Sequence, residues 1–121
     1  MSHPYYHSLS SVKQFGGEWN DYMKIHEWFD QTKLVIPDCR HRAILHSSFG
    51  IFLCQQVFGE ILVRESDGKS VPLRTIAERH VIEDMGFIPT PQDWFAGMKA
   101  EIWMAKGAKS LSKEEEQVIV D

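Results

Sequence analysis

Two ionisable side chains on an apolar helix face are the sequence's best candidates for chemistry. An α-helix advances about 100° per residue, so residues four apart lie on the same side. His80 and Asp84 have this spacing and fall within the apolar stripe of a predicted helix. That stripe consists of Leu73, Ile76, Ala77 and Val81. An imidazole and a carboxylate aimed into a core need partners, because an unpaired buried charge costs several kcal/mol.

The pair allows two interpretations. In the first, His80 and Asp84 hydrogen-bond to each other and fix the packing, since buried polar groups are usually satisfied internally. In the second, they belong to a metal-binding or catalytic site, where imidazole and carboxylate are common ligands. The sequence leaves both interpretations open.

Further candidates lie on two other predicted helices. His26 flanks the apolar stripe of residues 20–36, with Asp30 one turn later, so it could point to the same interior or to solvent. His46 is expected to be buried beside Gly50, whose missing side chain leaves room for a ligand, a water or another backbone. Histidines and carboxylates from several helices can converge in a bundle interior, as they do in metal sites.

The remaining histidines are weaker candidates. His41 lies about 140° from His46 on an ideal helix, so we expect it to line a surface or a cleft rim. His3 and His7 are four residues apart and could chelate one ion. Residues near a terminus are often loosely ordered, however, and this spacing is common by chance.

From these positions we predict a transition-metal site with His26, His46, His80 and Asp84 as ligands. Such a mixed set suits zinc, iron, manganese or nickel. The ion could activate a water for hydrolysis, with Asp30 or Asp84 as the catalytic residue that orients the water. The alternative is a non-catalytic interaction or regulatory protein, such as a homodimer, whose buried His–Asp pairs are structural. Neither a small-molecule substrate nor a protein partner is identified by the sequence.

The elements that must position these residues are mostly helical. Apolar residues at helical spacing, bounded by glycines and prolines, predict helices over residues 4–15, 20–36, 39–58, 73–85 and 91–106. Between the third and fourth of these, EILVRESDGKSVPL alternates around Asp67-Gly68, as is typical of a tight β-hairpin. The predicted fold is therefore mainly α, a compact bundle of about five helices with one small β-hairpin.

The predicted domain organisation is simple. Residues 1–107 are expected to form one helical domain, because neither a repeat nor a linker marks a second one. The last predicted helix would bury a stripe of Trp94, Met98, Ile102 and Ala105. Residues 108–121 have little apolar surface, so we expect a loosely ordered tail.

Charge and composition argue against several classes of protein. The net charge is −4 and the pI about 5.8, so no overall positive field attracts nucleic acid. Neither a leader pattern nor a long apolar segment suggests a membrane protein, and the expected location is cytoplasmic. Cys39 and Cys54 lie at no metal-ligand spacing and are expected to be free thiols. The chain also lacks the G-x-S-x-G turn of serine hydrolases and the glycine-rich phosphate loops.

Longer blocks of the sequence resemble a known family. They are RHRAILHSSFGIFLCQQVFG and RTIAERHVIEDMGFIPTPQDW, preceded by HPYYHSLSSVKQFGG and HEWFDQTK. Their central patterns are R-H-x4-H-x3-G and E-x-H-x3-D-x-G-x-I-P. Over about residues 3–95, the chain resembles a family of small uncharacterised bacterial and phage proteins. The family has no established activity, so the resemblance implies no role for the histidines or for Asp84.

Overall fold

The computed structural model describes residues 3–107. Its helices are α1 (Pro4–Phe15), α2 (Met23–Asp30), α3 (Arg42–Leu45), α4 (Ser48–Phe58), α5 (Leu73–Met85) and α6 (Pro91–Phe95). Strands β1 (Ile61–Val63) and β2 (Ser70–Pro72) pair antiparallel. Short 3₁₀ turns are η1 (Trp19–Asp21), η2 (Gln31–Leu34), η3 (Cys39–His41) and η4 (Ile102–Ala105). The prediction of a mainly α fold with a small β-hairpin is confirmed.

The chain divides into two compact units, Met1–Pro91 and Gln92–Asp121. The first unit holds α1 to α5 and the hairpin. The predicted tail, residues 108–121, lies outside the described residues. None of the helices described here combines the length and apolar character that a membrane span requires.

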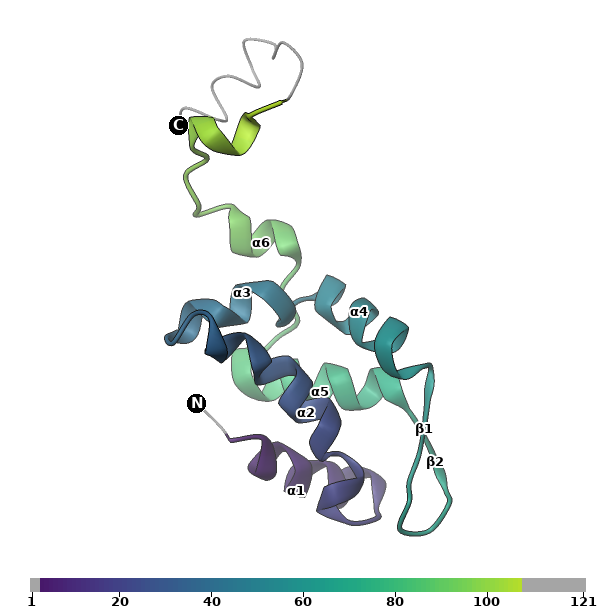
Figure 1. Cartoon of the computed structure of the whole chain (residues 1–121). Coiled ribbons are helices and arrows are strands. Elements are labelled where there is room, and N and C mark those ends of the chain that lie inside the picture. The colour runs from purple at the N-terminus through teal and green to yellow at the C-terminus, as the bar shows by residue number, and fades with distance from the viewer. Residues whose placement is uncertain (1–2, 108–121) are drawn as a thin grey trace. The chain divides into compact units, whose positions relative to one another are not determined.

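Helix α5 is the centre of the first unit and contacts α1, α2 and α4 (Figure 1). The apolar core around it consists of Tyr22, Ile25, Phe29, Leu45, Ile51, Cys54, Leu62, Val71, Leu73, Ile76, Ala77 and Val81. The histidines buried with this core are His7, His26, His41, His46 and His80. Because each ring brings two nitrogens out of water, a core of this kind requires polar partners for the imidazoles.

Two helices have the bounds predicted from the sequence, α1 and α5. The Nδ1 atom of His3 caps α1 by accepting a hydrogen bond from the Tyr5 amide at 3.1 Å. Gly86 ends α5 with a φ of +83°, in the left-handed region that favours glycine. The helix that carries His80 and Asp84 is therefore defined by local sequence.

The predicted helix over residues 20–36 is correct only in its middle. Helix α2 covers Met23–Asp30, and the chain tightens into 3₁₀ turns on both sides. The change after α2 comes at Asp30, whose φ and ψ are −98° and 0°. A candidate site residue therefore lies where the helix changes type.

The predicted helix over residues 39–58 is interrupted at His46 and Ser47. His46 leaves the helical region with a ψ of 68°, and the Ser47 hydroxyl accepts a hydrogen bond from the Gly50 amide to start α4. A Cβ atom at Gly50 would overlap the Leu45 carbonyl. The room left by Gly50 is thus filled by another backbone, one of the three possibilities that the sequence allowed.

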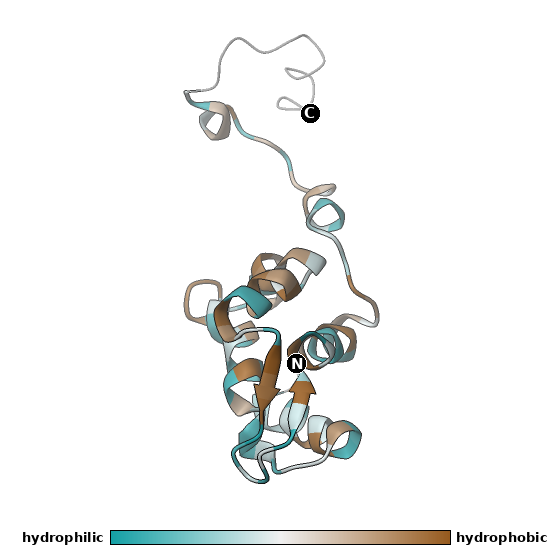
Figure 2. Cartoon of the chain, turned by 90° about the vertical axis from the view of Figure 1, so that its right-hand side faces the viewer, coloured by the Kyte–Doolittle hydropathy of each residue, from teal (hydrophilic) through white to brown (hydrophobic). Residues whose placement is uncertain are grey.

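The hairpin between α4 and α5 is confirmed. Its register pairs Ile61 with Pro72, Leu62 with Val71 and Val63 with Ser70. Gly68 has a φ of +73° in the connecting turn. Strand β1 is hydrophobic along its length (Figure 2), and its central residue Leu62 is buried.

The predicted helix over residues 91–106 is wrong. Helix α6 ends at Phe95, and only the short turn η4 follows. The Met98 amide bonds to the Phe95 carbonyl three residues earlier, so the helix tightens and ends there. Met98 and Ile102, expected in a core stripe, are half-exposed and exposed. Helical spacing of apolar residues does not maintain a helix when the stripe is not buried.

Candidate metal centre

The predicted site residues come from three places in the first unit. His80 and Asp84 lie one turn apart on α5, and His46 is the C-cap of α3. His26 and Asp30 occupy the second half of α2. The side chains of all five are buried.

Three ligand atoms from these residues meet at short distances. The Nε2 atoms of His46 and His80 are 3.2 Å apart. The Oδ2 atom of Asp84 lies 3.0 Å from His46 Nε2 and 3.4 Å from His80 Nε2. Ligands about 2.0–2.1 Å from one ion are about 3.3 Å apart in a tetrahedral site. The three atoms therefore outline one face of such a site, and the expectation that His80 meets an imidazole from another helix is confirmed.

Asp30 faces the same point from α2. Its Oδ1 atom lies 3.7 Å from His46 Nε2 and 3.6 Å from His80 Nε2, distances too long for hydrogen bonds. Within the described part of the chain, both Asp30 oxygens are buried without a hydrogen-bond partner. The four ligand atoms lie within 4.8 Å of one another. This His/Asp cluster could hold a metal ion, and an ion or its water would supply what the Asp30 carboxylate lacks.

His26 contacts the opposite edge of the His80 ring. The two Nδ1 atoms are 2.9 Å apart, and His26 Nε2 lies 2.8 Å from the Ser11 hydroxyl. When His80 Nδ1–H donates to His26, His26 donates to Ser11, and Ser11 donates to the His7 carbonyl at 3.1 Å. This order of donors leaves the His80 Nε2 lone pair free for a metal. The opposite order protonates Nε2, which then donates to Asp84.

His7 is a member of the cluster that the predicted ligand set omitted. Its Nδ1 atom lies 2.8 Å from Glu83 Oε1, and its Nε2 atom lies 3.2 Å from Asp84 Oδ1. The ring lies against that of His80 in a tilted arrangement, with centroids 4.0 Å apart and planes at 34°. Its two ring nitrogens point toward the carboxylates. His7, His26 and His80 also lie close together, but this arrangement does not suit a shared ion.

The comparisons with known proteins identify a family. A family model described as a domain of unknown function, DUF6915, matches residues 2–104. The chain belongs to this family. The matched range includes the whole cluster, from His7 to Asp84. No curated protein and no solved structure matches the chain.

Burial and contacts between neighbouring groups shift the pKa values of His26, His80 and Asp84 in this DUF6915 chain. Burial, reinforced by the neighbouring His80 and His7, lowers the pKa of His26 to about 2. Burial also lowers the pKa of His80 to about 4, although Asp30 beside it opposes the shift. At Asp84 burial raises the pKa, but the imidazoles in contact outweigh it and hold that pKa well below its usual range. Neutral imidazoles and an ionised carboxylate are the forms that bind metal ions.

His7 differs from His26 and His80 in the direction of its pKa shift. Burial lowers its pKa, but the hydrogen bonds to Asp84 and Glu83 outweigh burial and raise the pKa overall. A protonated His7 donates to both carboxylates at once. It thereby fixes Asp84 Oδ1 and leaves Oδ2 directed at His46 and His80.

The structure changes the expectations for two other histidines of the DUF6915 chain. His41 was expected at a surface or cleft rim, but it is fully buried and its Nδ1 atom lies 2.9 Å from the Thr32 hydroxyl. The irregular turn η3 replaces the ideal helix on which that expectation rested. His3 caps α1 and is exposed, while the ring nitrogens of His7 contact carboxylates, so the two bind different partners.

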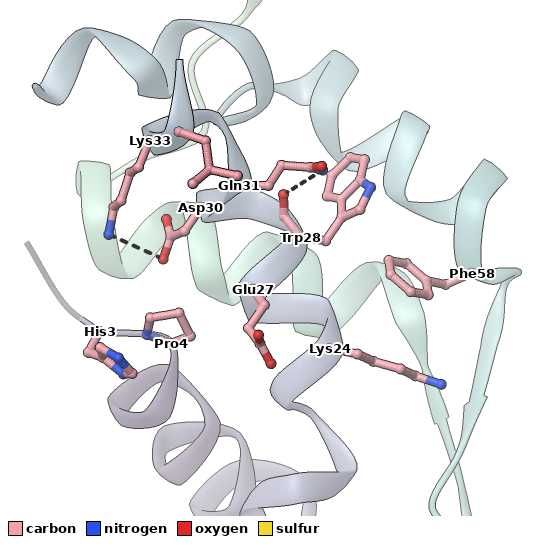
Figure 3. Close-up of a pocket in the computed structure, with 10 residues that line it drawn as sticks. His3, Pro4, Lys24, Glu27, Trp28, Asp30, Gln31, Lys33 and Phe58 are labelled. Carbon is pink, nitrogen blue, oxygen red and sulfur yellow. Dashed lines mark hydrogen bonds and ion pairs between the residues drawn. The ribbon is translucent and has the colours of Figure 1, made fainter. Parts of the chain in front are cut away.

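A surface groove of about 630 Å³ lies along α2 (Figure 3). Its lining comprises His3, Pro4, Lys24, Glu27, Trp28, Asp30, Gln31, Lys33, Leu34 and Phe58. Asp30 is the residue shared by the groove and the cluster. Its Oδ2 atom lies 3.7 Å from Lys33 Nζ, while its Oδ1 atom faces the imidazoles.

Proposed function

We propose that this protein binds one divalent transition-metal ion through His46, His80 and Asp84. The observation that carries the proposal is the set of separations of 3.0–3.4 Å among their ligand atoms. Two imidazoles and one carboxylate are a common protein ligand set for catalytic zinc and for non-haem iron. Of the four metals expected from the sequence, these two fit the three-ligand arrangement best.

Asp30 is assigned the role of binding the water on the ion. Its Oδ1 atom is farther from the imidazoles than Asp84 Oδ2 is, and Asp30 is also one of the residues that line the groove. A water in an open coordination position would donate a hydrogen bond to this carboxylate, whose oxygens have no donor within hydrogen-bond distance among the described residues. His26 is assigned a supporting role, because it contacts His80 through Nδ1 and not through the metal-facing Nε2.

This arrangement supports metal-assisted hydrolysis. A bound divalent ion lowers the pKa of its water to about 7, and Asp30 can accept the proton. The water oxygen then bonds to the electrophilic atom of the substrate, the bond to the leaving group breaks, and the proton ends on that group. Asp84 stays on the ion in this scheme and keeps it in place.

Cobalt(II) titration of the metal-free protein tests the proposal, since cobalt with four or five ligands absorbs strongly in the visible. Wild-type protein should saturate at one equivalent with an intense spectrum. Asp30→Asn should keep that spectrum and lose hydrolysis, whereas His80→Ala should lose the spectrum. The control is His3→Ala, an exposed histidine outside the cluster, which should titrate like wild type. A flat wild-type titration would reject the metal site.

A non-catalytic interaction protein is the second candidate function. Phe49 and Phe52 on α4 are half-exposed and stack on each other with ring centroids 6.0 Å apart. An exposed aromatic pair of this kind favours a protein contact, such as that of a homodimer. In this alternative the His–Asp pairs are structural, so the same titration separates the two candidates.

A further inference from the structure

The groove along α2 meets the metal centre at one side chain. Asp30 is only 7% exposed, yet it lines the groove while its Oδ1 atom faces His46 and His80. Figure 3 shows its carboxylate turned toward Lys33 at one end of the groove. A molecule bound at this end would therefore lie beside Asp30, whose carboxylate stands between the groove and the ion.

Lys33 is the cation at this end of the groove. Its side chain is about one-third exposed, and its ammonium lies 3.7 Å from Asp30 Oδ2. An ion bound on the other side of Asp30 would neutralise that carboxylate and weaken its hold on Lys33. The ammonium is then available to a second anion. Metal binding and anion binding at Lys33 should consequently reinforce each other.

The remainder of the groove is aromatic with charged edges. Trp28 and Phe58 form its wall and make an edge contact, with ring centroids 6.3 Å apart. Lys24 lies over the Phe58 ring, 5.9 Å from its centroid. Glu27, an exposed carboxylate on the same wall, disfavours a second negative charge away from Lys33. These surroundings suit a ring with a single anionic group at one end.

We propose that the groove admits phosphate monoesters of aromatic alcohols to the metal centre. The proposal rests on the proposed metal-assisted hydrolysis and names its substrate class. The phosphate would replace Asp30 Oδ2 beside Lys33, next to the water on the ion, and the aromatic group would lie against Trp28 and Phe58. The water oxygen bonds to phosphorus while the ester P–O bond breaks. Asp30 takes the proton of the water, and the proton passes to the departing aromatic alkoxide, so that one water yields inorganic phosphate and the alcohol.

The test compares nitrophenyl esters on full-length protein whose metal content has been measured first. Metal-loaded protein should hydrolyse p-nitrophenyl phosphate and show much lower kcat/KM for the uncharged p-nitrophenyl acetate. Lys33→Ala should raise KM for the phosphate about tenfold with a smaller change in kcat, since it removes one charge-assisted contact. The matched control is Lys13→Ala, an exposed lysine of α1 outside the groove, which should leave both constants unchanged.

A binding measurement supports the kinetic one. Phenylphosphonate, which cannot be hydrolysed, should quench tryptophan fluorescence of the metal-loaded protein and not of the Trp28→Phe variant. The groove proposal alone would be overturned if metal-loaded protein neither hydrolyses p-nitrophenyl phosphate nor binds phenylphosphonate. It would also be overturned if Lys33→Ala has the same KM for the phosphate as wild type. Protein that takes up no metal would overturn the proposed function, and the groove proposal with it.

Discussion

His80 is held from both edges of its ring. Its Nε2 atom faces His46 and Asp84, and its Nδ1 atom lies 2.9 Å from His26. Ser11 continues the chain of contacts at 2.8 Å from His26 Nε2. A metal ligand fixed in this way keeps one tautomer and one orientation, which strengthens metal binding. At the scale of residues, we therefore predict that groups remote from the ion affect the affinity of the site for metal.

Ser11→Ala tests this supporting chain. It leaves His26 Nε2 without its hydroxyl partner, so the affinity for zinc should fall about 10- to 100-fold, the usual effect of losing such a partner. Titration against a competing chelator measures the change. The matched control is Ser8→Ala, since Ser8 is also buried on α1 but donates to the Pro4 carbonyl. Equal zinc affinities of the two variants would contradict the supporting role.

Helix phase predicted some side-chain environments well and others poorly. His46 and His80 are buried as expected. Helix phase places Glu78 and Arg79 outside the apolar stripe of α5 and predicts that they are mostly exposed, but their side chains are only 31% and 41% exposed because each pairs with a charge one turn away. The position of a residue around the helix axis predicts the direction in which its side chain points. Ion pairs along the surface then lower the exposed fraction of the side chain.

The role of His7 could have been predicted from a pattern in α1. Pro4, His7, Ser8 and Ser11 are the buried residues of that helix, and they recur at the spacing of a core-facing stripe. The stripe gives no apolar signal because its members are mostly polar. A polar stripe at core spacing indicates that the facing interior is itself polar, as the cluster on α5 is.

At the scale of elements, the break between α3 and α4 brings His46 to the cluster. An uninterrupted helix over residues 39–58 was expected because apolar residues occur nearly all round it. Instead, Ser47 caps the start of a new helix, and Gly50 allows the backbone to pass close to Leu45, so the helix is interrupted. Such a break depends on packing between neighbouring turns, which the period of apolar residues does not encode.

Gly50→Ala tests the importance of this break. The new methyl group would overlap the Leu45 carbonyl, so α3 and α4 must separate and carry His46 with them. We expect a loss of about 1–3 kcal/mol in the free energy of unfolding and weaker metal binding. Urea denaturation and metal titration measure the two effects. Gly97→Ala is the control, because a Cβ there would meet nothing within 4 Å, and a wild-type-like Gly50→Ala would refute the argument.

Asp21 ties η1 to the hairpin loop. Its carboxylate accepts hydrogen bonds from the Glu18 amide at 2.8 Å and from the Ser66 amide at 3.1 Å. Burial raises the pKa of Asp21, but these bonds outweigh it, so the pKa lies below its usual value. A carboxyl group with a depressed pKa in the folded state stabilises the protein above its unfolded pKa of about 3.9. That stabilisation is lost as the pH falls through the folded pKa.

Asp21→Asn should therefore destabilise the protein most at neutral pH. The expected cost is about 1–3 kcal/mol at pH 7, since charge-assisted bonds from Glu18 and Ser66 are weakened. The difference from wild type should shrink toward pH 3. Urea midpoints at the two pH values give the comparison. A difference that grows in acid would have the wrong sign for this explanation.

At the scale of the whole molecule, the cluster joins parts of the chain that are distant in sequence. Asp30 comes from α2, His46 from the end of α3, and His80 and Asp84 from α5. An ion held by these groups would bind the folded chain and not the unfolded one. Metal binding would then add to folding stability by mass action. The function proposed for the molecule therefore depends on whether the cluster takes up metal.

Elemental analysis of protein purified without an affinity tag tests this claim most directly. Wild-type protein should contain roughly one zinc or iron ion per chain, as expected for a site with three protein ligands. His80→Ala should contain almost none and keep its helical circular dichroism, since His80 is a ligand in α5 and not the source of that helix. Wild-type protein that remains free of metal after incubation with excess zinc and iron, followed by dialysis, would contradict the account. The buried His–Asp pairs would then be structural.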